Sequence, residues 1–442
     1  MKIGVYLDIR DFLYMIILLK NINRYLNKEV TLKGWVFNLR SSGSIYFLQF
    51  RDGTGEIQAV VSKKEVDKES WSLTKKLTLE SSLEITGKVY QEKRSPSGYE
   101  MQVKNLKVFQ IAQEYPIGKK THGIDFLMDH RHLWLRSARQ QAILKIRNEI
   151  IWLIREFLRK NDFVLTDTPI LTPTPCEQVA LFETDYFGEK AHLAQSGQLY
   201  LEALIYSLGR VYDFGPTFRA EKSKTRRHLT EFWMIDAEAA FVEHQENMKI
   251  QEELVYYLVS QVLKNRKKEL EFLKRDLTLL KKIKSPFPKI TYDQAIELLK
   301  NKGLKIRWGD DFGGDEETIL SKSFNKPVFI EKYPANLKAF YMKPDPENPK
   351  YVLNDDLLAP EGYGEIIGGS QRIDDLKTLE EKIQQFKLPK KEYEWYLDLR
   401  RYGSVPHSGF GLGLERTVAW LCGLNHIRET IPFPRLINRL RP

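Results

Sequence analysis

One stretch in the middle of the chain gathers residue types that can hold a nucleotide. Arg219 and Glu221 are two residues apart, so on a strand their side chains point to the same face. A guanidinium there can hold a phosphate, and the carboxylate can accept from an exocyclic amine. The loop that follows is cationic, with Lys222, Lys224, Arg226, Arg227 and His228. Phe232 can stack on a base as it opens the returning strand. The stretch predicts a nucleotide site on an antiparallel hairpin, and a solvated basic hairpin gives the same pattern.

A second stretch, near the C-terminus, alternates glycine with apolar residues. Gly409, Gly411 and Gly413 leave one face of a strand without side chains, so a flat ligand can lie against the backbone. Arg416 then opens a helix predicted over residues 417–422 and is placed for a terminal phosphate. The spacing is neither the dinucleotide fingerprint nor a P-loop, since no Gly-Lys-Ser/Thr follows. Glycines that admit a neighbouring helix are the alternative, which leaves Arg416 without a role.

The elements of the first quarter predict a small barrel. Short strands are predicted over residues 30–36, 45–50, 56–61, 83–89 and 100–109, with a helix over 64–79 after the third. This is the layout of an OB-fold β-barrel, a frequent reader of single-stranded nucleic acid, and another small β-barrel is the alternative. Phe47 and Gln58 project from the second and third strands. A core position is the alternative for Phe47.

The rest of the chain is predicted as α+β. A long amphipathic helix over about 137–160 leads into a strand over 163–170, where Pro169 suits only an edge or end position. Strands and helices then mix without regular βαβ spacing, which favours an antiparallel sheet flanked by helices. A further helix is predicted over 292–302. The predicted divisions are an N-terminal extension and lead-in (1–28), a barrel (29–112), a linker (113–136) and a larger domain (137–442) with an inserted subdomain (286–345).

Composition indicates the class of partner and the compartment. The formal charge of +10 and the pI of about 9.1 suit a polyanion such as nucleic acid, and equally a generally basic soluble enzyme. Cys176 and Cys422 alone indicate neither a zinc cluster nor a disulfide framework, which fits a reducing cytoplasm. The apolar run 12–19 is too short to span a bilayer, and Asp8 and Arg10 disfavour a secretory signal. No membrane association and no zinc are therefore predicted.

The motifs resemble a known family when they are taken together. The proline strand at 163–170, the Arg219–Phe232 hairpin and the glycine strand ending at Arg416 are similar, in order, to the three signature motifs of class II aminoacyl-tRNA synthetases. Within that class, the chain resembles the subgroup that charges aspartate, asparagine and lysine, and most closely the bacterial asparaginyl-tRNA synthetases. The resemblance runs from about residue 29 to the C-terminus, and its closer part lies in residues 194–200, 364–372 and 401–409.

The resemblance implies ATP-dependent ligation of L-asparagine to tRNA(Asn) through an asparaginyl-adenylate. It places Arg219 on the ATP α-phosphate and the substrate carboxylate, and Glu221 on the adenine amine. Phe232 is expected to stack on adenine, while His228 and Arg416 contact the γ-phosphate. Arg219 and Arg416 are thus the residues expected to carry catalysis, by positioning and charge neutralisation.

Further roles follow from the same resemblance. Glu177, Ser196 and Gln198 are expected to receive the ammonium of the amino acid, and Arg372 its side-chain carbonyl. Glu365 and Asp356 are expected to ligate Mg²⁺, which prefers oxygen ligands shared with phosphate. In the barrel, Phe47 is expected to stack on the central anticodon base and Gln58 to hydrogen-bond it, and the strand around Pro169 is expected to build a homodimer interface.

A few features of the sequence bear on the choice between asparagine and aspartate and on the alternative functions. Aspartyl enzymes of this subgroup place a lysine where this chain has Leu201, so asparagine is favoured over aspartate. A tRNA-independent asparagine synthetase would lack the barrel, and a non-catalytic RNA-binding paralogue would not keep Arg219, Glu365 and Arg416 together. The loop 176–180 departs from the family pattern, because it lacks a glycine and is one residue shorter. That departure bears on the role of Glu177 and on loop closure.

Overall fold

The computed structural model describes residues 17–176 and 180–442 and divides them into two compact units. One unit ends at His122 and the other begins at Gly123. In the described part of the chain, no helix is long and apolar enough to cross a membrane.

The first unit is a closed barrel with the strand order β1-β2-β3-β5-β4. Its elements are η1 (Leu19–Tyr25), β1 (Glu29–Ser42), β2 (Ile45–Arg51), β3 (Glu56–Ser62), α2 (Lys68–Thr74), β4 (Ser82–Gln91) and β5 (Tyr99–Gln110). Alternate residues of β1, such as Val30, Leu32 and Val36, are buried inside the barrel, as a period of two requires. The predicted OB-fold is confirmed. Helix α2 is shorter than predicted because Asp67 caps it, accepting from the Ser70 amide at 2.6 Å.

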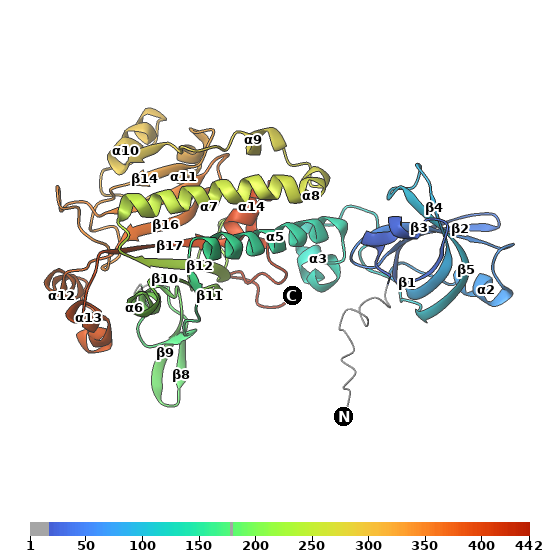
Figure 1. The fold of residues 1–442 in the computed structure, drawn as a ribbon, viewed down its shortest axis with the longest axis horizontal. Helices are drawn as coiled ribbons and strands as arrows, with labels where there is room; N and C mark the ends of the chain where they lie inside the picture. The colour runs from blue at the N-terminus through green and yellow to red at the C-terminus, as the bar shows by residue number, and fades with distance from the viewer. Residues whose placement is uncertain (1–16, 177–179) are drawn as a thin grey trace, which may run out of the picture. The chain divides into compact units, whose positions relative to one another are not determined.

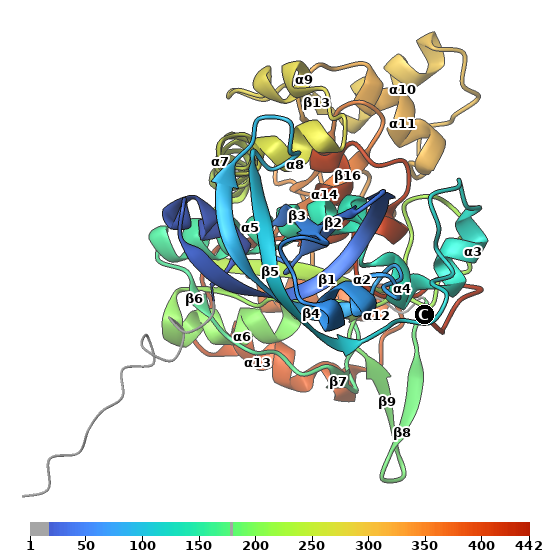
Figure 2. The same cartoon turned by 90° about the vertical axis from the view of Figure 1, so that its right-hand side faces the viewer.

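The second unit is built on a nine-stranded sheet, as far as the structure describes it. Along its main path the order is β13-β14-β15-β16-β17-β12-β10-β6, and β11 pairs with β12. These strands are β6 (Val164–Leu165), β10 (Arg210–Tyr212), β11 (Gly215–Phe218), β12 (Glu231–Ala240), β13 (Lys289–Thr291), β14 (Val328–Glu331), β15 (Asn354–Ala359), β16 (Gly364–Gln371) and β17 (His407–Gly413). A separate small sheet holds β7 (Leu171–Thr172), β8 (Glu183–Tyr186) and β9 (Glu189–Leu193); Figure 2 shows the β8–β9 hairpin extending from this unit.

Long helices α5 and α7 lie side by side across one face of the sheet (Figure 1). The helices of this unit are α3 (Ile124–Asp129), α4 (Arg131–Trp134), α5 (Ala138–Lys160), α6 (Gln198–Leu208), α7 (His244–Asn265), α8 (Lys267–Phe272), α9 (Leu277–Lys281), α10 (Tyr292–Asn301), α11 (Gly314–Lys322), α12 (Leu376–Gln385), η2 (Lys390–Tyr393), α13 (Glu394–Arg401), α14 (Leu414–Cys422) and η3 (Ile427–Glu429). Helix α5 matches its prediction because Ser137 caps it, accepting from the Gln140 amide at 3.3 Å. The main core lies between this helical layer and the sheet.

Three sequence predictions need correction. The sheet is antiparallel except at its two ends, where β13–β14 and β10–β6 are parallel, so it is a mixed sheet. Within 163–170 only β6 is a strand; it occupies the sheet edge, and Pro169 follows it. Strand β11 ends at Phe218, so Arg219 and Glu221 lie in the loop after it rather than on a strand.

In the segment predicted as an inserted subdomain, 286–345, the elements divide between two environments. Strands β13 and β14 extend the main sheet. Helices α10 and α11 pack in a separate apolar cluster that includes Ile296, Leu320 and Tyr333.

Candidate active site

Two adjoining cavities lie on the face of the sheet opposite α5 and α7. The larger has a volume of about 580 Å³ and the smaller about 70 Å³, and both are lined by Arg219, Met234, Glu365 and Gly411. They therefore form one continuous site, and Arg219 stands where its two parts meet.

Strand β12 divides its side chains between core and site. Ile235, Ala237 and Ala239 belong to the main core, while the intervening Asp236 and Glu238 line the larger cavity. Successive residues of a strand point to opposite faces, so one strand serves both purposes.

The glycines of β17 make room for those carboxylates. Gly409 pairs with Glu238 and Gly411 with Asp236. A Cβ at Gly409 would lie 2.1 Å from Glu238 Oε1, and one at Gly411 would lie 2.7 Å from Asp236 Oδ1. The expectation of a ligand against the bare backbone is thus wrong at Gly409, where the carboxylate of Glu238 fills the space, whereas Gly411 and Gly413 line the smaller cavity.

The smaller cavity collects the residues predicted to hold the nucleotide. The Arg219 guanidinium lies 5.6 Å from the centroid of the Phe232 ring, and Glu221 Oε2 lies 3.6 Å from His228 Nε2. The Arg219 amide donates to the Thr230 carbonyl at 3.0 Å, which continues the hairpin pairing one residue beyond β11. Arg219, Glu221, His228 and Phe232 are thereby brought together without Arg219 or Glu221 being in a strand.

Arg416 closes this end of the site. Its Nη1 donates to both the carbonyl and the Oε2 atom of Glu365, each at 3.0 Å. Burial, and after it the Arg416 cation, lowers the pKa of His228, which favours the neutral imidazole near pH 7. An arginine cation and a neutral imidazole thus face the far end of the cavity.

Two carboxylates flank Gly368 in the lining of the larger cavity. A Cβ at Gly368 would lie 3.1 Å from Glu365 Oε1 and 3.8 Å from Asp356 Oδ1. Lys338 Nζ donates to Asp356 Oδ2 at 2.7 Å. Two carboxylates around one point, with space for phosphate oxygens beside them, fit Mg²⁺. In residues 17–176 and 180–442, no group of three or more His, Cys, Asp or Glu side chains is arranged to hold a metal unaided.

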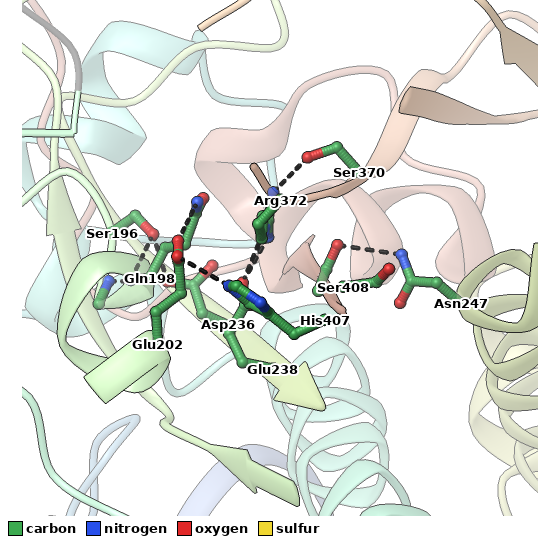
Figure 3. Close-up of polar contacts among 12 residues, drawn as sticks. Ser196, Gln198, Glu202, Asp236, Glu238, Asn247, Ser370, Arg372, His407 and Ser408 are labelled. Carbon is green, nitrogen blue, oxygen red and sulfur yellow. Dashed lines mark hydrogen bonds and ion pairs between the residues drawn. The ribbon is translucent and has the colours of Figure 1, made fainter. Parts of the chain in front are cut away.

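The opposite end of the larger cavity is lined by a network of buried polar side chains joined by hydrogen bonds (Figure 3). Ser196 Oγ and the Gly197 amide both donate to Asp236 Oδ2 at 2.9 Å. Gln198 Nε2 donates to Glu202 Oε1 at 3.0 Å. Ser196 and Gln198 both line the cavity, as their predicted role requires.

Arg372 and Glu238 belong to the same network of buried polar side chains. Arg372 Nε and Nη2 both donate to Glu238 Oε1, at 3.0 and 2.5 Å. Glu238 Oε2 is buried and has no hydrogen-bond partner among the residues that the structure describes. Burial, only partly offset by Arg372, raises the pKa of Glu238 to about 8. The Arg372 guanidinium and the Glu238 carboxyl group therefore lie side by side in the cavity lining, and one oxygen of Glu238 is left unused there among the described residues.

In the barrel unit, Phe47 is half-buried and lies outside the barrel core, so its interpretation as a core residue is wrong. The Arg40 guanidinium lies 4.6 Å from the centroid of its ring. Gln58 Nε2 donates to Glu100 Oε2 at 2.7 Å. Phe47 and Gln58 are on neighbouring strands, with Phe47 opposite Val60 and Gln58 opposite Gln49.

Comparison with known proteins agrees with both units. The family described as "tRNA synthetases class II (D, K and N)" matches residues 123–437, and an "OB-fold nucleic acid binding domain" matches residues 30–109. The asparagine–tRNA ligase of Desulforamulus reducens is 59% identical over 426 residues, covering 96% of this chain and 99% of that protein. The chain belongs to the asparagine–tRNA ligase family. The Pelotomaculum thermopropionicum asparagine–tRNA ligase is 58% identical, with 96% and 99% coverage.

Solved structures of asparaginyl- and aspartyl-tRNA synthetases have the same fold. The asparaginyl-tRNA synthetase of Pyrococcus horikoshii, complexed with asparaginyl-adenylate, has a TM-score of 0.94 at 47% identity, covering 97% of this chain and 99% of that chain. The Entamoeba histolytica asparaginyl-tRNA synthetase has a TM-score of 0.89 at 34% identity, covering 97% and 100%. The aspartyl-tRNA synthetase of the same organism has a TM-score of 0.82 at 30% identity, covering 97% and 92%.

For this member of the ligase family, sequence reasoning missed several residues of the site. Asp236, Glu238 and Lys338 line the cavity without having been singled out. Two carboxylates at alternate positions of a strand opposite a glycine strand are the signal that could have found the first two. Lys338 comes from an irregular segment and carries no such signal. Glu177 lies outside the described residues.

The position expected to decide selectivity does not reach the cavity. Leu201 is fully buried in a small apolar cluster with Ile205 and Val211. It therefore gives no direct contact on which to discriminate asparagine from aspartate, and the charges that line the cavity must do so.

Proposed function

We propose that the chain ligates L-asparagine to tRNA(Asn) in an ATP-dependent reaction through an asparaginyl-adenylate. The observation that carries the proposal is the position of Arg219. Its guanidinium joins a cavity with nucleotide-binding residues to one with amino-acid-binding residues. A phosphate and a carboxylate can both reach it there, as adenylate formation requires.

In the first step the asparagine carboxylate attacks the α-phosphorus of ATP, and pyrophosphate leaves. Arg219 holds the α-phosphate and the attacking carboxylate, while Arg416 and His228 hold the far end of the triphosphate. Phe232 stacks on adenine and Glu221 accepts from its amine. The residues act by positioning and by neutralising charge, and no covalent enzyme intermediate is involved.

Mg²⁺ would be held by Glu365 and Asp356, supported by their two carboxylates around Gly368. Bound there, the ion would neutralise charge on the phosphate oxygens. No role is proposed for zinc.

The amino acid is held by the network of buried polar side chains at this end of the cavity. Ser196, Gln198 and Glu177 take its ammonium, and Arg372 donates to its side-chain carbonyl. In its ionised form, Glu238 accepts from the side-chain amide through Oε2, the oxygen left without a partner among the described residues. Against the ionised form of Glu238, an aspartate carboxylate would face a second carboxylate in a buried site, so this form of the site favours asparagine.

In the second step the 3′-hydroxyl of the terminal ribose of tRNA attacks the adenylate. The barrel, residues 29–112, reads the anticodon with Phe47 and Gln58. The segment 113–136 leads from it to the catalytic domain, 137–442, with its inserted subdomain at 286–345, and from Gly123 onward this segment already belongs to the second compact unit. Exposure of the edge strand supports a homodimer built around Pro169, since Val164 and Leu165 are both 43% exposed. The enzyme is assigned to the cytoplasm, where its tRNA substrate is used.

ATP–pyrophosphate exchange on the purified protein, without tRNA, tests this function. Asparagine and aspartate are compared side by side, and exchange is expected with asparagine alone. Exchange with aspartate alone would contradict the assigned substrate. Exchange with neither would indicate a non-catalytic paralogue.

A further inference from the structure

A buried carboxylate behind the amino-acid cavity has no place in the mechanism above. Glu202 is fully buried, yet it accepts hydrogen bonds at both of its oxygens. Tyr396 and Arg400 donate to Oε2 at 2.7 and 2.6 Å, and His407 Nε2 lies 3.0 Å from the same oxygen. Gln198 donates to Oε1 at 3.0 Å; Figure 3 shows the contacts of Glu202 with Gln198 and His407. Three of these contacts converge on Oε2 and one reaches Oε1, so both oxygens of the carboxylate have a partner.

Two helices present these groups through the same spacing. Gln198 and Glu202 are four residues apart on α6, and Tyr396 and Arg400 are four apart on α13, so each pair lies on one helix face. His407 begins β17. Through His407, the motif 401–409 therefore contacts α6, the helix that carries Gln198. Apart from its glycines, this motif had no function in the mechanism above.

Glu202 is held in its ionised form. Although burial opposes the charge, Arg400 and His407 keep the pKa of Glu202 well below its ordinary value. An ionised carboxylate only accepts hydrogen bonds. The amide of Gln198 must therefore turn its Nε2 toward Glu202, which leaves its Oε1 for the cavity that Gln198 lines.

We propose that Glu202 is a positioning residue that fixes the amide of Gln198 with its oxygen toward the ammonium of the amino acid. The proposal rests on the function proposed above, in which Gln198 receives that ammonium. A freely turning amide would present its NH₂ group to the ammonium part of the time, and two donors repel. Glu202 thus contributes to amino-acid binding without touching the substrate.

Replacing the carboxylate by an amide, Glu202→Gln, removes the constraint, because Gln can either donate to Gln198 or accept from it. In ATP–pyrophosphate exchange the KM for asparagine is expected to rise about tenfold, the value of one misdirected hydrogen bond, while the KM for ATP stays within about twofold. Glu149→Gln is the matched control, since Glu149 also pairs with an arginine, Arg266 at 2.6 Å, away from the cavities. It is expected to leave both constants unchanged.

The swap Gln198→Glu with Glu202→Gln keeps one amide and one carboxylate at the same two positions. It restores an oxygen toward the ammonium, so the KM for asparagine is expected to return to within about threefold of wild type. This variant tests the proposal even where the single variant does not fold. A KM that stays raised about tenfold in the swap, or an unchanged KM in folded Glu202→Gln, overturns the proposal.

Two sulfamoyl analogues of the adenylate, with and without the α-ammonium, separate orientation from general damage. Glu202→Gln is expected to weaken only the analogue that has the ammonium, in a competition measured by inhibition of exchange. Equal weakening of both analogues would show a merely structural role and overturn the proposal. If the wild-type protein itself gives no exchange with asparagine, it is the proposed function that fails.

Discussion

Lys338 Nζ lies 2.7 Å from Asp356 Oδ2, next to the point where Asp356 and Glu365 approach Gly368. The same ammonium lies 3.8 Å from the centroid of the Tyr333 ring. A lysine cation thus neutralises one of the two carboxylates proposed to hold Mg²⁺. Lys338 contacts Oδ2, whereas Oδ1 is the oxygen nearer Gly368, so a Mg²⁺ ion held there would share the carboxylate with a close like charge and would compete with Lys338 for Asp356.

The first prediction follows from this competition. Lys338→Met keeps the length of the side chain and removes its charge, so Asp356 is left for the divalent ion. The Mg²⁺ concentration that half-saturates ATP–pyrophosphate exchange is expected to fall about threefold or more, as the loss of a close like charge implies. Lys343→Met is the control, since Lys343 pairs with Asp374 at 2.8 Å outside the cavity lining. A higher Mg²⁺ requirement in Lys338→Met would contradict the prediction.

The second prediction concerns pH and selectivity. The pKa of Glu238 is raised to about 8, so the group is increasingly protonated as the pH falls below that value. A protonated Glu238 donates and suits an aspartate carboxylate, whereas the ionised form accepts and suits the asparagine amide. The ratio of kcat/KM for asparagine to that for aspartate is therefore expected to rise between pH 7 and pH 9. The ratio cancels titration of the α-amino group, which both amino acids share.

Glu238→Gln is the control for this pH dependence. A glutamine side chain does not titrate, so the ratio of kcat/KM for asparagine to that for aspartate is expected to stay constant with pH in this variant. A wild-type ratio that is also flat, or that falls with rising pH, would show that Glu238 does not face the amide.

The elements that sequence analysis predicted well are those set by local pattern. Alternating apolar residues in β1 and the Ser137 cap of α5 are properties of neighbouring residues, so the barrel and the long helix were predicted correctly. The two parallel pairings at the sheet ends were not, because β6 has only two residues and its partner β10 lies far along the chain.

The residues of the site also divide into those that a local sequence pattern predicts and those that depend on the pairing of distant strands. Arg219, Glu221, His228 and Phe232 are close in sequence, and the structure brings them together. Asp236 and Glu238 depend on the register between β12 and β17, which places each of them opposite a glycine. Leu201 shows the converse case, since its helical neighbours and not the sequence motif decide that it faces the core.

The third prediction concerns Arg219 and separates the function of the catalytic unit from that of the barrel. Arg219→Ala removes the cation that both substrates share, and adenylate formation is expected to fall roughly 100- to 1,000-fold, the loss typical of one stabilising group at a reacting centre. Binding of tRNA(Asn) through the barrel is expected to persist, as measured by filter binding. Near-normal pyrophosphate exchange in this variant would refute the role of Arg219.

The fourth prediction is the reciprocal change in the barrel. Phe47→Ala removes a half-buried ring that lies outside the barrel core, so the barrel is expected to stay folded. Exchange without tRNA should match wild type, while the KM for tRNA(Asn) rises about tenfold, as the loss of one base stack implies. An unchanged KM for tRNA would show that the ring does not contact the anticodon.

The fifth prediction addresses the exposed edge of the main sheet. Strand β6 ends the strand order, and its Leu165 is 43% exposed, so an apolar strand edge is left uncovered in a single chain. Leu165→Lys is expected to convert a dimer into monomers in sedimentation velocity, because a dimer would have to bury the new charge. Phe272→Lys is the matched control: Phe272 lies on α8, is 56% exposed, and is expected to leave the dimer intact. A wild-type monomer, or a Leu165→Lys dimer of unchanged affinity, would show that β6 is not the interface.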